Sequence, residues 1–199
     1  MSPDQGTPQD VRWSFGAPVM PAQIADQLAG QGLELKQASG RKLGSVLAVL
    51  TLVAVAAAAL RRAPRVAAEV RATRGPAWDA FVVGAAVYVS AFVLGASFNY
   101  RQIHLLLCAP LALEWRRRPA LRTLGTALLV LPAAAAWLGA LQPELSLPAI
   151  GVSWNLRLDG FATWLLFAAA WFALVLVLRE RLAGPRTTPS RATNQRLVG

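Results

Sequence analysis

The stretch that decides the fold is LGSVLAVLTLVAVAAAAL at residues 43–60, and Arg61 and Arg62 follow it directly. None of its eighteen residues carries a charge. A helix of roughly 17–25 mainly apolar residues is long enough to cross the hydrocarbon core of a membrane. Residues 43–60 therefore predict a membrane-spanning helix that ends at a pair of arginines.

Similar apolar runs follow along the chain at residues 80–98, 124–141 and 161–178. A weaker run at residues 103–114 includes His104. Counted from Asn99 to Trp115 it crosses a membrane if Arg101 extends to the interface and Trp115 anchors the other end. We therefore predict an all-α membrane protein with about five transmembrane helices in residues 43–178.

The composition excludes most soluble classes of protein. Hydrophobic residues make up 55% of the 199 residues and charged residues 15%, whereas a soluble domain has about 25% charged residues. A disordered chain needs low hydrophobicity, so it is excluded as well. The single cysteine, Cys108, rules out a disulfide framework and a multi-cysteine zinc site. We predict no metal site and no cofactor.

Basic residues gather in three segments, 61–77, 115–122 and 179–199, which hold fourteen of the twenty Lys and Arg residues. A five-span arrangement puts these segments on one side of the membrane. Basic loops stay cytoplasmic, so we predict an outside N-terminus and a cytoplasmic C-terminus. The net charge of +10 then reflects topology and contact with membrane lipids, and nucleic acid is not an expected partner.

The excess of arginine over lysine, eighteen against two, indicates a GC-rich bacterial genome, and we predict a multi-pass protein of the bacterial inner membrane. Residues 1–42 are expected to form a polar tail on the outer face, with a short amphipathic helix within 22–36. Residues 179–199 are expected to form a basic, disordered cytoplasmic tail. A long outer tail without a signal peptide suggests the C-terminal part of a longer polytopic protein.

Polar residues gather where the second run turns into the third, at Asn99, Tyr100, Arg101 and His104. One interpretation is structural: a turn at Asn99, an aromatic belt at Tyr100 and a lone hydrogen-bonded histidine. The other is an anion site in which Arg101 holds a phosphate and Asn99 and Tyr100 add hydrogen bonds. His104 would then donate or carry a proton.

A second outer cluster contains Arg157 and Asp159. Asp159 either caps the last helix or acts on a substrate at the outer leaflet, alone or paired with Arg101. Glu144 is the other outer carboxylate. Both clusters fall on one side of the predicted membrane, which makes a shared outer site geometrically possible.

Several residues within the runs predict how the helices pack. Small residues give the second run a stripe suited to close packing or to contact with a partner helix. Tyr88 is expected to hydrogen-bond to a neighbouring helix, and Cys108 to be an inert buried thiol. Pro110 and Pro132 are expected to kink their helices. The small residues of the stripe are Gly84, Ala85, Ala86, Ser90 and Gly95.

The stretch GASFNYRQIHLLLCAP at residues 95–110 resembles a mostly uncharacterised bacterial family of polytopic membrane proteins, whose shared stretch reads G-x-x-x-x-Y-R-x-x-x-L-L-L-x-x-P. LDGFATWLLF at residues 158–167 is similar to that family's last-span entry, L-D-E-x-x-x-W-L-L-F, with Gly160 in place of the acid. The resemblance covers residues 43–178. The family is similar in layout to GT-C-type glycosyltransferases, which take sugars from polyprenyl-phosphate carriers on the outer face.

The resemblance implies a component of envelope glycan assembly that uses a polyprenyl-phosphate-linked sugar. Arg101 and Arg157 would hold the lipid-linked phosphate, Asn99 and Tyr100 would orient it, and Asp159 would act as the catalytic base. The alternative is a non-catalytic membrane subunit or scaffold that binds other membrane subunits, and a transporter component is the third interpretation. The chain has no P-loop, dinucleotide fingerprint, HExxH or GxSxG motif.

Overall fold

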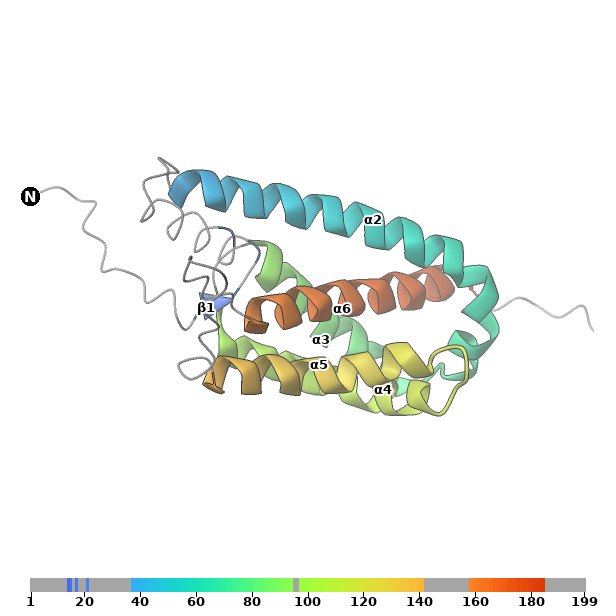
Figure 1. Ribbon diagram of the computed structural model, residues 1–199. Helices are drawn as coiled ribbons and strands as arrows, with labels where there is room; N and C mark the ends of the chain where they lie inside the picture. The colour runs from blue at the N-terminus through green and yellow to red at the C-terminus, as the bar shows by residue number, and fades with distance from the viewer. Residues whose placement is uncertain are drawn as a thin grey trace, which may run out of the picture.

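The computed structural model of the chain describes residues 37–94, 97–141 and 158–184, together with Ser14, Phe15, Ala17 and Pro21. This part is a bundle of helices, which confirms the all-α prediction (Figure 1). One small antiparallel pair joins β1 (Ser14–Phe15) to β2 (Ser97–Phe98). The helices are α2 (Gln37–Ala72), α3 (Pro76–Leu94), the 3₁₀ helix η2 (Asn99–Cys108), α4 (Ala109–Arg116), α5 (Arg122–Leu141) and α6 (Leu158–Leu182).

Three helices of the described part are long and apolar enough to cross a membrane: Lys42–Ala72, Pro76–Leu94 and Gly160–Leu182. A shorter apolar helix covers Arg122–Leu138. These helices support the prediction of a multi-pass membrane protein. They correspond to the first, second, fifth and fourth apolar runs of the sequence.

Helix α2 extends well beyond the apolar run and continues through the arginines to Ala72, where the sequence suggested a basic loop. The extension is amphipathic, because Ala63, Val66, Ala67 and Val70 recur at helical spacing and are all buried. We call residues 61–72 the end segment of α2. Figure 1 shows α2 bending towards this end, and Pro64 inside the helix accounts for a bend.

The third run is helical in two forms. Ten residues from Asn99 to Cys108 form the 3₁₀ helix η2, and α4 continues to Arg116. Pro110 lies in the first turn of α4, where its missing N–H costs no helical hydrogen bond. The proline expected to kink this run therefore lies where the 3₁₀ form gives way to the α form.

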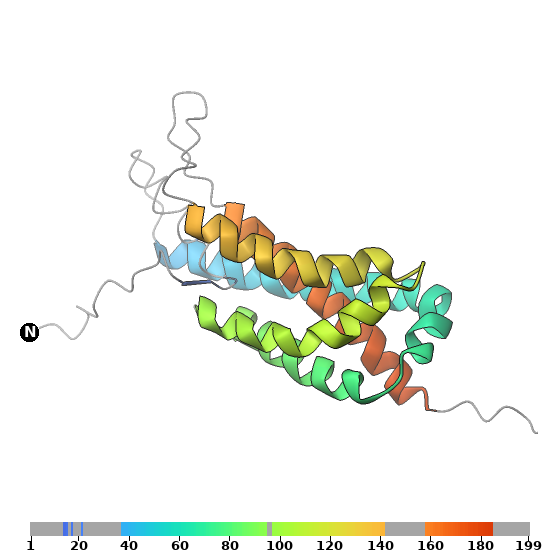
Figure 2. The ribbon, with the colours of Figure 1, turned by 90° about the horizontal axis from the view of Figure 1, so that it is seen from below.

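The described parts of the three basic segments lie at one end of the bundle, which is compatible with the predicted position of these segments on one side of a membrane. Figure 2 shows the end segment of α2, the turn between α4 and α5, and the last turn of α6 at this end. We call it the basic end. The starts of η2 and α6 lie at the opposite end (Figure 2).

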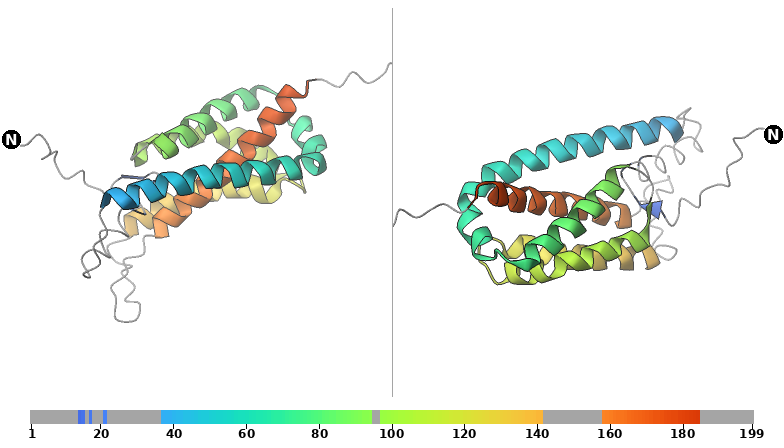
Figure 3. Two further views of the ribbon diagram at one scale, coloured as in Figure 1. Left: turned by 90° about the horizontal axis from the view of Figure 1, so that it is seen from above. Right: turned by 180° about the vertical axis from the view of Figure 1, so that it is seen from behind.

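Helix α6 packs against α2, α3 and α5 (Figure 3). Its Phe167 stacks on Phe92 of α3 with ring centroids 4.4 Å apart, and Trp164 meets Phe92 edge-on at 5.1 Å. The Tyr88 hydroxyl donates a hydrogen bond to the Thr163 carbonyl oxygen at 3.3 Å, which confirms the expected contact with a neighbouring helix. An aromatic core thus joins α3 to α6.

Helix α2 is the least enclosed of the three long apolar helices. Only 17% of its most apolar window is buried, against 39% for α3 and 50% for α6. It is attached to α6 by packing and by the Trp171 indole, whose Nε1 donates to the Leu52 carbonyl oxygen at 2.8 Å. Most of the outward surface of α2 is left to lipid or to another protein.

The predicted boundaries of the two tails differ from the helices. Helix α6 continues to Leu182, so its last turn includes residues assigned to the C-terminal tail. Helix α2 begins at Gln37, before the end of the predicted N-terminal tail. Residues 22–36, where an amphipathic helix is expected, and residues 185–199 lie outside the described residues.

The small-residue stripe of α3 is used inside the bundle. A Cβ added at Gly84 would collide with the His104 carbonyl oxygen and would lie 2.9 Å from Leu107 Cβ. Ala85 is fully buried, and Cys108, whose Sγ lies 3.3 Å from the same added Cβ at Gly84, is buried as predicted. The expectation that this stripe contacts a partner is wrong for Gly84 and Ala85, because η2 and the rest of the bundle already cover them.

Gly84→Ala should lower the free energy of unfolding by about 1–3 kcal/mol, the usual cost of overpacking a tight contact. Gly75→Ala is the matched control, since a Cβ there meets nothing within 4 Å. Thermal unfolding in detergent, followed by circular dichroism, would compare the two variants. Equal melting temperatures would contradict the close approach of α3 and η2.

Candidate functional site

The residues predicted for an outer site lie at the end opposite the basic end. The backbone of Asn99, Tyr100 and Arg101 opens η2, and Asp159 is the second residue of α6. The side chains of these four residues lie outside the described part of the chain. The two predicted clusters therefore share one end of the bundle, while contacts among their side chains stay a prediction.

Arg157 and Glu144, the other residues considered for this site, lie outside the described residues altogether. His104 lies in η2 and is half-buried. Its backbone carbonyl contacts the position of Gly84 on α3. The helix-packing role of His104 is thus visible, and a proton-transfer role for its ring stays a prediction.

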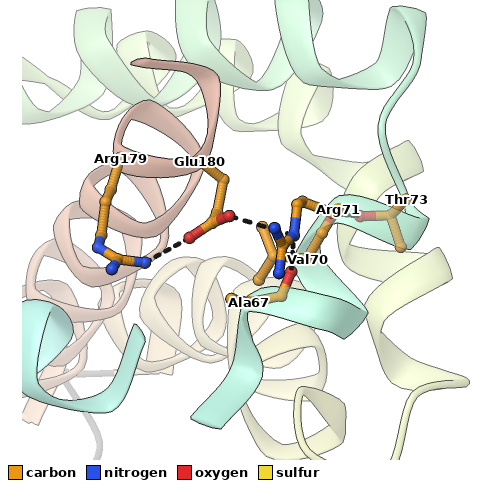
Figure 4. Close-up of polar contacts among 6 residues, drawn as sticks. All are labelled: Ala67, Val70, Arg71, Thr73, Arg179 and Glu180. Atoms are coloured by element: carbon orange, nitrogen blue, oxygen red, sulfur yellow. Dashed lines mark hydrogen bonds and ion pairs between the residues drawn. The ribbon is translucent and has the colours of Figure 1, made fainter. Parts of the chain in front are cut away.

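The densest polar cluster of the described residues lies at the basic end, which the sequence did not indicate as a site. At its centre Glu180 of α6 is only 3% exposed (Figure 4). Arg71 of the end segment approaches it with Nε 3.4 Å from Oε2, and Arg179 binds the other carboxylate oxygen. Arg71 Nε also donates to the Ala67 carbonyl oxygen at 3.2 Å.

Thr73 forms the second half of this cluster. Its hydroxyl donates to the Val70 carbonyl oxygen at 2.8 Å. The same oxygen accepts hydrogen bonds from the indole of Trp115 on α4 at 3.0 Å and from that of Trp78 on α3 at 3.4 Å. A buried indole N–H needs such a partner. One threonine thus joins the end segment of α2 to α3 and α4.

We call Arg71, Thr73, Trp78, Trp115, Arg179 and Glu180 the polar junction. Two exposed contacts surround it. Arg181 Nη2 lies 2.9 Å from Asp79 Oδ1, and the Ala120 backbone N–H donates to Glu69 Oε2 at 3.1 Å. The second contact joins the end segment of α2 to the turn between α4 and α5.

The arrangement of the polar junction indicates fastening of helices rather than catalysis. Glu180 is engaged by two arginines, and the Thr73 hydroxyl is fully used. Among the described residues, no group of three or more His, Cys, Asp or Glu side chains is placed to hold a metal ion. Within the same residues the buried side-chain nitrogen without a partner is Trp164 Nε1, far along α6 from the junction.

Glu180 could have been noticed in the sequence as the single acid between Arg179 and Arg181. A carboxylate in that position shields like charges from one another, but the pattern does not name Arg71 as a partner. Thr73 carries no sequence signal at all, since threonine is common in turns. The polar junction is a product of tertiary packing.

The chain was compared with known protein families, curated proteins and solved structures. No family model, no curated protein and no solved structure matches it. Function must therefore be argued from the chain's own residues.

Glu180→Gln should lower the free energy of unfolding by about 3 kcal/mol, because it leaves two arginines without a buried counter-charge. Asp79→Asn is the control: Asp79 is 68% exposed, and losing an exposed ion pair costs less than about 1 kcal/mol. Chemical denaturation in detergent micelles measures both. If the two variants are equally stable, the ion pair does not hold the basic end together.

Proposed function

We propose that the protein crosses a bacterial inner membrane five times, with the basic end in the cytoplasm and the other end outside. The lengths of the two shorter crossings support this proposal. At about 2.0 Å per residue the ten residues of η2 cover roughly 20 Å, and the eight of α4 add roughly 12 Å. The twenty residues of α5 cover about 30 Å, the thickness of the hydrocarbon core.

Single cysteines in a Cys108→Ala background test the orientation. Ala120→Cys at the basic end should react with a membrane-impermeant maleimide only after the membrane is opened. Lys42→Cys, exposed near the opposite end of α2, should react in intact cells. The reverse pattern would overturn the orientation, and labelling of both in intact cells would overturn the transmembrane arrangement.

We further propose that the protein is a non-catalytic membrane subunit, which binds another membrane protein through α2. The observation that carries this proposal is the exposure of α2. The helix packs only lightly on the rest of the bundle, and its outward surface is apolar. In addition, the buried polar groups of the polar junction already have partners: Glu180 binds two arginines, and the Thr73 hydroxyl binds two indoles.

Two alanines mark the place on α2 where a partner helix would fit. Ala54 and Ala58 lie one turn apart and are both exposed. Small residues at this spacing let two helix backbones approach closely, whereas lipid chains pack equally well against leucine. An exposed pair of alanines is therefore suited to contact with a helix of another subunit.

Ala54→Leu combined with Ala58→Leu should disrupt the complex while keeping α2 apolar. The matched control is Ala133→Leu with Ala136→Leu, an exposed alanine pair on α5. Size-exclusion chromatography with light scattering in mild detergent measures the protein mass of the particle without its bound detergent. For wild type and control this protein mass should exceed the 21.2 kDa of one chain. In the α2 variant the association constant of the complex should fall at least about tenfold, which corresponds to roughly 1.4 kcal/mol of binding free energy.

A monodisperse wild-type monomer would overturn the subunit proposal and favour the second candidate, a GT-C-like enzyme. This candidate is supported by the shared location of the Asn99–Arg101 segment and Asp159 at one end of the bundle. In it Arg101 would hold the phosphate of a polyprenyl-phosphate-linked sugar, and Asp159 would act as base. Arg101→Ala would then abolish glycan transfer in cells without changing membrane insertion.

A further inference from the structure

The basic end carries more positive charge than the polar junction uses. Among its described acids, Glu180 pairs with Arg71 and Arg179, and Asp79 pairs with Arg181, whereas Glu69 accepts a hydrogen bond from the Ala120 backbone N–H. Seven further arginines at this end are exposed and form no ion pair within the described part. One of them, Arg74, lies over the Trp78 ring, 5.8 Å from its centroid. The other six lie on the end segment of α2 and around the turn between α4 and α5. They are Arg61, Arg62, Arg65, Arg116, Arg117 and Arg122, which we call the arginine face.

The two halves of the arginine face are held beside each other. Three of its members lie on the end segment of α2, and three lie around the turn between α4 and α5. The hydrogen bond from the Ala120 N–H to Glu69 fastens that turn to the end segment. Arg65 lies one helical turn before Glu69, so it lies on the same side of the helix as this contact.

The fold also turns these arginines outward. The apolar side of the end segment is buried against the bundle through Ala63, Val66 and Val70. The opposite side, with Arg61 and Arg65, is exposed. An amphipathic helix with its apolar side already covered by protein has only its charged side to offer to the surroundings.

In the five-span arrangement proposed above, the arginine face lies at the depth of lipid headgroups. Arg61 directly follows the apolar run of α2, and Arg122 lies two residues before that of α5. In a chain that spans a membrane, residues at the ends of apolar runs lie at the boundary between hydrocarbon and water. The negatively charged groups at that boundary are lipid phosphates, which guanidinium groups bind through paired hydrogen bonds.

We propose that the arginine face is a binding site for anionic phospholipid headgroups of the adjoining leaflet. The end segment of α2 lies along the headgroup layer, and the turn between α4 and α5 completes the site from the other side. This inference rests on the membrane-spanning arrangement and is independent of whether α2 binds another subunit. The positive-inside rule explains these arginines only as signals that orient the chain during membrane insertion. The proposal gives them a ligand in the folded protein.

The test measures lipids retained by the purified full-length protein. The protein is exchanged from detergent mixed with equal amounts of phosphatidylglycerol and phosphatidylcholine, and native mass spectrometry counts the bound lipids. Wild type should retain phosphatidylglycerol preferentially. Arg61→Gln with Arg65→Gln should reduce this retention by roughly fivefold per arginine, whereas replacement of both by lysine should keep most of it.

Arg41→Gln with Lys42→Gln is the control, since it removes the same charge near the opposite end of α2 and should leave retention unchanged. If the variant of the end segment does not fold, Arg117→Gln with Arg122→Gln tests the other half of the face. Equal retention of the two lipids by wild type would overturn the proposal. Displacement of phosphatidylglycerol by millimolar inorganic phosphate would also overturn it, because the site would then bind soluble anions.

Discussion

The basic end of the bundle depends on one ion pair in a place that water barely reaches. Glu180 carries a negative charge at 3% exposure, and only Arg71 and Arg179 make that burial tolerable. Because Arg71 belongs to the end segment of α2, the requirement holds this segment across the last turn of α6. Thr73, two residues further, then lies where the indoles of Trp78 and Trp115 reach its hydroxyl.

From this fastening the surfaces of the protein follow. The end segment of α2 buries Ala63, Val66, Ala67 and Val70 and leaves Arg61, Arg62 and Arg65 exposed, which gives the basic end its positive surface. The remainder of α2 extends along the bundle with most of its apolar side chains uncovered. Helix α3 differs from α2, because Gly84 lies so close to η2 that the small-residue side of α3 is covered within the protein. Sites for lipid and for partners are therefore expected on α2 and at the basic end.

Much of the architecture could be predicted from residues close together in the chain. The runs at residues 43–60 and 161–178 each lie within a long helix, and the run at residues 80–98 is helical as far as Leu94 but ends in the strand Ser97–Phe98. Hydropathy over eighteen residues depends on local composition alone. The grouping of basic segments at one end followed from counting charges. The expected contact of Tyr88 also held, because a mid-membrane hydroxyl needs an acceptor and a neighbouring helix supplies one. The outer site of Asn99, Arg101 and Asp159 was also inferred from residues close together in the chain, and it stays a prediction.

The sequence by itself determined that the protein is helical and apolar, and where its basic segments lie along the chain, because both properties depend on residues that are close together in the sequence. Only the tertiary structure decided that Glu180 pairs with Arg71, that Thr73 serves two tryptophans, and that Gly84 packs inward. It also decided that the arginines after residue 60 continue a helix. These choices depend on which distant side chains share a buried, low-dielectric space, where each polar group must find a partner.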